Sequence, residues 1–218
     1  MAVAKAFLFD LNGTMIDDME FHLKVWHDVL NYELHAGLSL QEVKNNMYGT
    51  GEELLARVFG KDKFTAIEAS AILRAKEEKY QKVYKPHLDL LPGLFDFLEK
   101  AHQKGIPMAI GSAAPLFNID FALDNLNIRH YFGAVVSGQD VAESKPHPEV
   151  FLKAAELINA SPESCIVFED APKGVEAALN AGMKSIVITG MHTEEEFSRY
   201  PNVLRFVPDY LSIQDLVQ

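Results

Sequence analysis

Short runs of consecutive apolar residues recur along the chain, and longer segments with a helical repeat separate them. The apolar runs lie at residues 6–9, 107–110, 134–136, 165–168 and 185–188. Unbroken runs of this length predict strands buried on both faces, as in a parallel sheet. The helical patterns that alternate with them lie at residues 93–104, 115–126, 148–158 and 171–181. This alternation predicts an α/β fold built on a doubly wound, Rossmann-like parallel sheet.

Residues 17–84 break the alternation, because they contain helical patterns and no strand pattern. The helical patterns lie at residues 19–32, 39–46, 51–59 and 65–84. Pro86 and Pro92 then mark the point at which the alternation of strand and helix patterns resumes. We therefore predict a core of residues 1–16 and 85–218, with an all-helical cap domain of residues 17–84 inserted after the first strand. A cap and a core of this kind are typical of an active site that closes by domain motion.

Charge and cysteine content limit the expected partners and compartment. With 218 residues and a formal net charge of -11, the surface repels nucleic acid and anionic membranes, so neither is an expected partner. No apolar stretch approaches the roughly 18 residues of a membrane span, and the first run is too short for a signal peptide. Cys165 is the only cysteine and lies in an apolar run, which indicates a buried structural thiol in a reducing compartment. We expect a cytoplasmic protein, with a monomer as the default state.

Residues that could form an active site follow the predicted strands. The polar ones are, in chain order, Asp10, Asn12, Ser112, Lys145, Glu169 and Asp170, and Ala113 follows Ser112. Ligands of open α/β sheets bind outside the carboxyl ends of the strands, so these residues are expected to gather at one edge. Singly, each type is common in turns, at helix starts or on the surface. Their combination predicts a site for phosphoryl transfer, which needs a nucleophile, charge neutralisation and fixed positioning.

Each residue type has a task in that chemistry. Asp10 is the candidate nucleophile, because a carboxylate can attack phosphorus and form an aspartyl-phosphate. Ser112 and nearby backbone N–H groups are expected to hold the transferring phosphoryl oxygens, and Lys145 to neutralise charge as a compact ammonium. Glu169 and Asp170 offer the hard oxygen ligands that Mg²⁺ prefers. The predicted cofactor is Mg²⁺ and the predicted partner a small phosphorylated substrate.

Four segments also resemble the motifs of the haloacid dehalogenase superfamily. These segments are residues 9–14 (Phe-Asp-Leu-Asn-Gly-Thr), 111–112 (Gly-Ser), 144–148 (Ser-Lys-Pro-His-Pro) and 168–175 (Phe-Glu-Asp-Ala-Pro-Lys-Gly-Val). The resemblance implies that Asp10 is the nucleophile, and that Asp10, the Asn12 carbonyl and Asp170 hold Mg²⁺ with Glu169 close by. It also implies a catalytic role for the residues at Asn12, Ser112 and Lys145.

A closer similarity is to the beta-phosphoglucomutase-like and sugar-phosphatase branch of that superfamily. Residues 21–26 are similar to its cap-entry helix, in which a His and a Trp lie four apart, here His22 and Trp26. The similarity implies substrate contacts for His22, for Lys76 and for the loop around Gly49, although Lys76 also fits a solvated helix charge and Trp26 fits packing. The sugar mutases have an arginine near Glu52, whereas this chain has an acid there, which favours a phosphatase.

Asn12 departs from the superfamily pattern, whose second aspartate is the general acid and base. An amide retains the hydrogen-bonding shape but exchanges no proton near neutral pH. Three explanations stay open: an engineered substitution, a natural one with a good leaving group or another proton carrier such as His22, or a drift towards phosphate-ligand binding. Haloacid dehalogenases need no Mg²⁺, and phosphonoacetaldehyde hydrolases have a cap-loop lysine that residues 47–53 lack. The expected function is hydrolysis of a small phosphate ester such as a sugar phosphate, with a phosphoglucomutase-type isomerase as the enzyme alternative.

Overall fold

The computed structural model describes residues 6–218, and the first five residues of the predicted core lie outside the described part. The chain divides into two compact units. One comprises the segment that ends at Asp17 together with Asp89–Gln218, and the other is Asp18–Leu88. The predicted boundaries fell after residues 16 and 84, so the structural division lies one and four residues further along the chain. Each unit is described by itself.

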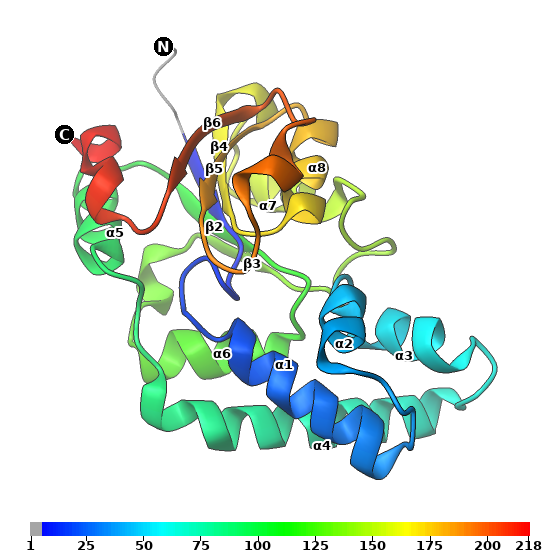
Figure 1. Ribbon diagram of the computed structural model, residues 1–218. Helices are drawn as coiled ribbons and strands as arrows, with labels where there is room; N and C mark the ends of the chain where they lie inside the picture. Colours follow the sequence, from blue (N-terminus) through cyan, green and yellow to red (C-terminus); the bar gives the residue numbers. More distant parts are fainter. Residues whose placement is uncertain (1–5) are drawn as a thin grey trace. The chain divides into compact units, whose positions relative to one another are not determined.

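The larger unit is built on a six-stranded parallel sheet (Figure 1). Its strands are β1 (Ala6–Phe9), β2 (Met108–Gly111), β3 (Ala134–Val136), β4 (Cys165–Glu169), β5 (Lys184–Ile188) and β6 (Val203–Val207). They lie in the order β3-β2-β1-β4-β5-β6. The chain therefore winds outwards from β1 in both directions, which confirms the predicted α/β fold class. Phe9 pairs with Ile110 of β2 and with Phe168 of β4, so Asp10 follows a central strand.

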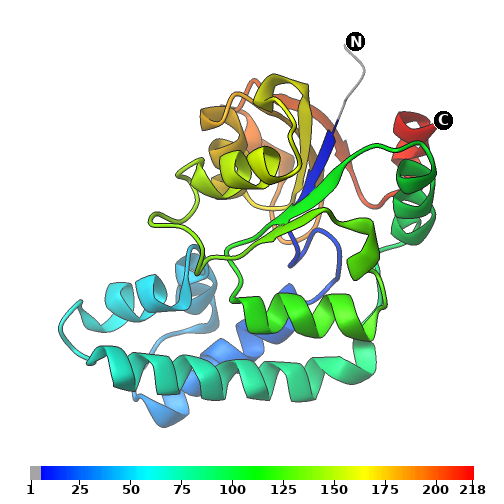
Figure 2. The same cartoon turned by 180° about the vertical axis from the view of Figure 1, so that it is seen from behind.

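Helices cover both faces of this sheet, as the two views in Figures 1 and 2 show. They are α5 (Leu94–Gln103) on one face and α7 (Glu149–Leu157) and α8 (Pro172–Asn180) on the other. The helix α6 (Leu116–Asn125) follows β2 in the same unit. Alternate residues of β1 serve the two faces: Leu8 joins a cluster with Phe151 of α7, whereas Phe7 packs on Phe97 of α5 with ring centroids 5.2 Å apart. Because both faces are buried, β1 is an unbroken apolar run and not an alternating one.

The last strand, β6, was absent from the predicted strands, which placed only unspecified closing elements there. Its apolar sequence is interrupted by Arg205, whose guanidinium donates to both carboxylate oxygens of Asp215 at 2.8 and 2.7 Å. As the edge strand, β6 pairs with β5 alone and is only partly buried. An edge strand needs no continuous apolar run, so the pattern that identified the other strands is lacking here. Short 3₁₀ helices complete the unit: η3 (Arg129–Tyr131), η4 (Pro162–Ser164), η5 (Glu194–Phe197) and η6 (Leu211–Val217).

The smaller unit is helical throughout. Its elements are α1 (Met19–Asp28), the π-helical turn η1 (Val29–Glu33), α2 (Leu40–Asn46), α3 (Gly51–Phe59), α4 (Ala66–Tyr84) and the 3₁₀ helix η2 (Lys85–His87). Each of α2, α3 and α4 begins with a capping box. The side chain of Ser39, Thr50 or Thr65 accepts a hydrogen bond from the N–H of the third helical residue, and the glutamate at that third position accepts one from the N–H of the capping residue. These reciprocal bonds satisfy orphan helix donors, so the local sequence sets where each helix begins. The pattern at 19–32 predicted one helix, which the structure continues as α1 and η1.

Among the described residues, no helix is both long and apolar enough to cross a membrane. This agrees with the absence of a long apolar stretch in the sequence.

Cys165 gives a direct test of the described core. Its thiol is 1% exposed at the start of β4, and burial raises its pKa to about 11. Because the thiolate is the reactive form, the native protein at pH 8 should resist alkylation and react fully after denaturation. Mass spectrometry after brief iodoacetamide treatment with and without guanidinium measures both states. Rapid labelling of the native protein would contradict the packing around β4.

Candidate active site

Three charged side chains meet where β1 and β4 end. The Lys145 ammonium donates to Oδ1 of Asp10 at 2.5 Å and to Oε1 of Glu169 at 2.8 Å. All three residues are less than a tenth exposed. Asp10 follows β1, Glu169 ends the neighbouring β4, and Lys145 arrives from the segment between β3 and α7. The sheet therefore brings Asp10 to Lys145, which is 135 positions further along the chain.

The electrostatics of this cluster combine burial with opposite charges. Burial raises the pKa of the Asp10 carboxyl, the Lys145 ammonium counteracts this, and the pKa settles at about 6. For Lys145, burial favours the neutral amine, but the facing charges of Asp10 and Glu169 outweigh burial and raise its pKa. Asp10 is thus an anion paired with a cation above pH 6. A carboxylate kept ionised in a poorly solvated site has the character of a nucleophile.

Glu169 is fully engaged in holding its neighbours. While Oε1 accepts from Lys145, Oε2 accepts from the backbone N–H groups of Asp170 and Ala171 at 2.8 and 2.7 Å. These contacts connect Lys145 to the start of α8. The expectation that Glu169 lies close to a bound Mg²⁺ stays a prediction. Gly174 makes room for this arrangement, because a Cβ at that position would lie 1.7 Å from Oε1 of Glu169. The sequence reasoning gave Gly174 no function beyond its place in a motif.

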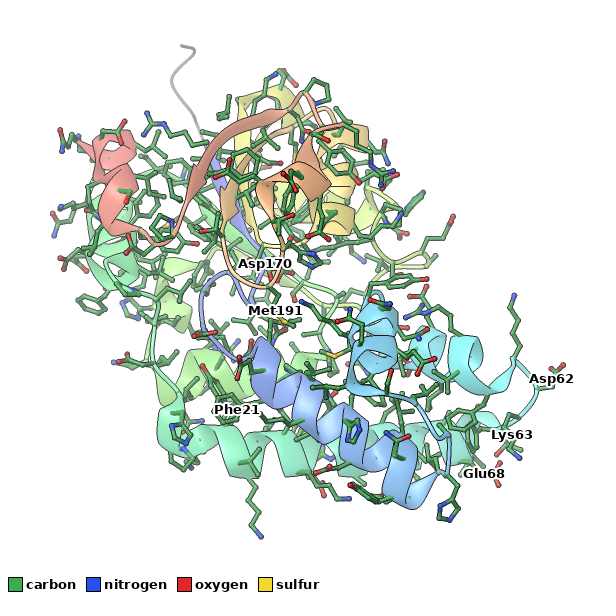
Figure 3. All side chains as sticks on the ribbon, viewed as in Figure 1. Phe21, Asp62, Lys63, Glu68, Asp170 and Met191 are labelled. Atoms are coloured by element: carbon green, nitrogen blue, oxygen red, sulfur yellow. The ribbon has the colours of Figure 1, made fainter. Side chains whose placement is uncertain are left out.

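Asp170 follows Glu169 at the same sheet edge and is labelled in Figure 3. Its Oδ1 accepts from the Thr14 hydroxyl at 3.4 Å, and it is 4% exposed. Tyr210 supports the other side of Thr14, since its hydroxyl donates to the Thr14 carbonyl oxygen at 3.1 Å. Burial, with the nearby charges of Asp10 and Asp170, raises the pKa of Tyr210 well above its ordinary value. Tyr210 was missed from sequence because nothing in its local pattern distinguishes it from a core aromatic.

Asn12 lies in the loop that leads from Asp10 to Thr14. Its backbone forms a bridge with Ile16, and the Gly13 N–H donates to the Ile16 carbonyl at 2.9 Å. Gly13 has a φ of 72°, a conformation that glycine adopts without strain. The turn therefore holds the Asn12 backbone in a defined conformation, whichever side chain the residue carries.

Ser112 and Ala113 begin the loop that follows β2. The Ser112 N–H donates to the Val136 carbonyl of β3 at 3.0 Å, and its hydroxyl accepts from the Ala114 N–H at 3.2 Å. A hydrogen bond from this hydroxyl also lowers the pKa of Asp10. Ser112 is 1% exposed. The structure thus brings Ser112 to the predicted nucleophile and places Ala113 next to it.

The carboxylates at this sheet edge are candidate ligands for a cation. Within residues 6–218, no three His, Cys, Asp or Glu side chains converge as a ready-made metal site. However, Asp10, Glu169 and Asp170 are three buried carboxylates at the ends of β1 and β4, and Lys145 pairs with the first two. Carboxylates gathered at one buried sheet edge offer hard oxygen donors to a cation. Two carboxylates supplemented by a backbone carbonyl and water suit Mg²⁺, which rarely uses an all-protein cage.

In the helical unit, His22 and Lys76 lie together. The Lys76 ammonium is 2.7 Å from Nδ1 of His22 and 3.0 Å from each carboxylate oxygen of Glu77, and it lies 4.9 Å from the centre of the Trp26 ring. Lys76 is 2% exposed, so the interpretation as a solvated helix charge was wrong. Burial lowers its pKa, and the Glu77 charge opposes that effect. Trp26 is buried, in agreement with a packing role.

A second pair extends this buried cluster towards the start of α1. The Tyr80 hydroxyl donates to Oδ2 of Asp18 at 2.5 Å, and Nε2 of His22 lies 3.3 Å from the same oxygen. The His22 and Tyr80 rings stack with centroids 3.8 Å apart. The ends of α1 and α4 are therefore joined by side chains that satisfy one another. Phe21, beside His22, is labelled in Figure 3 and packs on Tyr84.

Gly49 lies in the short loop between α2 and α3, with a φ of 71°. Arg57 holds this loop by donating to the carbonyl oxygens of Asn46 and Tyr48. Its guanidinium also lies 3.8 Å from the centre of the Tyr48 ring. The loop is thus anchored from within the helical unit.

The sheet, the Asp10 cluster and the motif order together point to one family. The model of the haloacid dehalogenase-like hydrolases matches residues 7–188. The chain belongs to this family. The resemblance noted in the sequence is confirmed, and so is the expectation of an enzyme. The match spans residues of both units, including the whole helical insertion.

Several relatives are similar over most of their length. Fructose-1-phosphate phosphatase YqaB of Escherichia coli is 31% identical over 184 residues, which cover 82% of this chain and 93% of that protein. Beta-phosphoglucomutase of Bacillus subtilis is 30% identical over 189 residues, or 84% and 82% of the two chains. A solved structure of CbbY from Rhodobacter sphaeroides, an Asp-to-Asn mutant with xylulose-1,5-bisphosphate, matches with a TM-score of 0.80 and 27% identity, covering 92% and 93%.

Gly174→Ala tests the buried ion-pair arrangement. The new Cβ displaces Glu169 from Lys145 and from two backbone donors, so unfolding free energy should fall by about 3 kcal/mol, the scale of a broken buried pair. Urea denaturation measures this change. Gly190→Ala is the matched control, because a Cβ at Gly190 meets nothing within 4 Å and should cost no more than about 0.5 kcal/mol. Equal effects of the two changes would show that Glu169 does not occupy the described position.

Proposed function

We propose that this protein is a Mg²⁺-dependent phosphatase of small phosphate esters, with sugar phosphates as the substrate class and Asp10 as the nucleophile. The observation that carries the proposal is the buried Asp10 carboxylate, paired at 2.5 Å with Lys145 at the carboxyl edge of the sheet. An ion pair whose only purpose was stability gains little from such deep burial. A nucleophile that must attack an anionic ester, by contrast, needs a cation beside it.

The reaction divides into two displacements at phosphorus. In the first, a carboxylate oxygen of Asp10 forms a bond to phosphorus while the bond from phosphorus to the alcohol oxygen breaks. In the second, a water oxygen forms a bond to phosphorus while the bond from phosphorus to the Asp10 oxygen breaks, which releases phosphate and the Asp10 carboxylate. Solvent water supplies the proton that the leaving alcohol oxygen gains and takes up the proton that the attacking water loses. Lys145 offsets the negative charge of nucleophile and phosphoryl group throughout. The Ser112 hydroxyl and the backbone after it bind the transferring oxygens and keep them aligned with Asp10.

The carboxylates of Asp10 and Asp170 and the carbonyl oxygen of Asn12 would hold Mg²⁺. The burial of both carboxylates at the same sheet edge supports this assignment, and Glu169 lies close by, with hydrogen bonds to Lys145 and to two backbone N–H groups. When bound, the cation shields the repulsion between the Asp10 carboxylate and the anionic substrate. Thr14 connects Asp170 to the loop that contains Asn12, and Tyr210 holds Thr14 in place through its carbonyl oxygen.

Asn12 weakens proton transfer and leaves the rest of the site intact. The leaving alcohol oxygen must gain a proton, and the attacking water must lose one, but a neutral amide can perform neither task. Its backbone lies in the Asn12–Ile16 bridge, so the proposed carbonyl ligand does not depend on the side chain. We therefore expect slow turnover by this chain and ordinary binding of Mg²⁺ and phosphate.

The substrate class draws support from relatives named for sugar phosphates: a fructose-1-phosphate phosphatase and a beta-phosphoglucomutase. The second name also supports a sugar phosphomutase as the competing function. The guanidinium of Arg57, in α3, donates to the carbonyl oxygens of Asn46 and Tyr48 beside Gly49. An arginine that is already bonded to these carbonyls is poorly suited to bind a second phosphate, and this favours hydrolysis.

Asn12→Asp is the central test of the proposed function. Restoring a carboxyl at this position should raise phosphate release from sugar phosphates by about a hundredfold or more, the usual scale of general acid–base help. Release is measured on a panel of sugar phosphates with and without Mg²⁺, for this chain and the variant. Asp10→Asn, alone and combined with Asn12→Asp, is the control that should abolish turnover. If Asn12→Asp binds Mg²⁺ but releases no phosphate from any ester of the panel, the hydrolase proposal is refuted.

Mg²⁺ should also stabilise the protein independently of turnover. A cation that binds only the folded state at about 100 times its dissociation constant adds about 2.7 kcal/mol, which should raise the melting temperature by several degrees. Differential scanning calorimetry with Mg²⁺ or with chelator measures the shift. Asp170→Asn should remove most of it, whereas Asp96→Asn, the same change on the exposed surface of α5, should retain it. An unchanged shift in Asp170→Asn would exclude this ligand.

A further inference from the structure

The segment after β3, residues 137–140, forms a tight turn that the proposed function does not use. Asp140 closes the turn, because one of its carboxylate oxygens accepts from the N–H of Ser137 at 2.9 Å and from its hydroxyl at 2.6 Å. The Ser137 hydroxyl in turn accepts from the Gln139 N–H at 3.3 Å. Lys153 of α7 donates to the Asp140 carbonyl at 2.8 Å. We call residues 137–140 the β3 turn.

The β3 turn lies directly against the loop that begins with Ser112. The Gly138 N–H donates to the Ala114 carbonyl at 3.1 Å. A Cβ built on Gly138 would lie 2.4 Å from the Ala113 carbonyl oxygen and 3.1 Å from its carbon. Both atoms belong to the backbone, so a side chain at this position cannot be accommodated by a rotation. Only glycine permits the two backbones to approach this closely.

Gln139 adds a second link between the same two segments. Its side-chain oxygen accepts from the N–H of Leu116, the first residue of α6, at 3.2 Å. The N-cap residue Pro115 makes no side-chain bond to the helix. The β3 turn therefore supplies in tertiary contact an acceptor that the local sequence does not provide.

These contacts lead to the nucleophile by a short path. The peptide that joins Ala113 to Ala114 has its carbonyl oxygen beside Gly138, and its N–H donates to the Ser112 hydroxyl. That hydroxyl also faces Asp10 closely enough to lower the pKa of its carboxyl. A displacement of the Ala113 carbonyl thus moves the donor that orients Ser112. Positioning errors of about 1 Å at a reacting centre are costly, on the order of a hundredfold in rate.

We propose that Gly138 and Gln139 are positioning residues for phosphate recognition, which set the conformation of residues 112–116 from the neighbouring strand. The inference rests on the proposed function, in that Ser112 and the backbone after it bind the transferring phosphoryl oxygens. Neither residue contacts the substrate. Gly138 sets how closely the β3 turn approaches the loop, and Gln139 fixes where α6 begins.

The test compares Gly138→Ala with the parent, both on the Asn12→Asp background so that turnover is measurable. Gly138→Ala should raise the Kd for inorganic phosphate in the presence of Mg²⁺ by about 10- to 100-fold, the cost of a misplaced binding group. The inhibition constant of phosphate and the KM of a sugar phosphate should rise with it. Calorimetry with inorganic phosphate is the direct measurement, and the melting temperature reports on the fold.

Matched variants separate positioning from general damage. Gly190→Ala, with open space around the new Cβ, should retain the parent Kd for phosphate. Gln139→Ala removes only an exposed side chain, so the melting temperature should stay within about 1 °C of the parent value, the scale of a neutral surface change. The same variant should still bind phosphate about threefold more weakly, close to the loss of one modest hydrogen bond.

If Gly138→Ala fails to fold, the phosphate Kd of Gln139→Ala is the result that tests the inference. Parent-like phosphate binding in a folded Gly138→Ala, or in Gln139→Ala in that case, overturns the inference. A parent protein that binds no phosphate and releases none would refute the proposed function instead.

Discussion

The buried ammonium of Lys145, held between the carboxylates of Asp10 and Glu169, constrains much of the larger unit. Burying one of these charges without its partner costs several kcal/mol, so the three residues must reach the same point together. Glu169 does so only because Gly174 leaves room for its carboxylate. Asp10 does so because β1 and β4 are adjacent and parallel. The strand order and a glycine in α8 are thus both coupled to one ion-pair cluster.

The same cluster explains why a cation belongs to the chemistry proposed for this site. Lys145 pairs with two of three buried carboxylates, and the phosphate ester would add further negative charge. In the proposed reaction the Ser112 loop would meet part of this demand for positive charge and hydrogen-bond donors, and a divalent cation would meet the rest. In the helical unit the polar residues are arranged differently. Lys76 pairs there with Glu77, and Asp18 accepts from Tyr80 and lies beside His22, so these buried polar groups find partners within the unit.

Loops that follow neighbouring strands also depend on one another. The loop after β1 is held through Thr14, which bonds to Asp170 and Tyr210, whereas the loop that begins with Ser112 is held by the β3 turn. Each of these partners lies in a segment remote in sequence from the loop that it holds. This arrangement keeps the candidate phosphate-binding groups rigid while their side chains stay small, as with Ser112 and Ala113. Rigid preorganised donors are the main source of stabilisation in phosphoryl transfer.

Local sequence determined the strands β1 to β5, the helix starts and the identity of the charged residues at the sheet edge. Continuous apolar runs and capping boxes are local signals, and Asp10, Lys145 and Asp170 lie in motifs that can be read in order. Only the tertiary structure decided that Glu169 binds Lys145, that Lys76 is buried against Glu77, and that Tyr210 and Gly138 support the loops. It also placed β6, whose edge position requires no apolar run. The physical reason is that the partner of a charged side chain depends on which segments of the chain meet. The same holds for a close approach of two backbones, and a one-dimensional pattern does not record which segments meet.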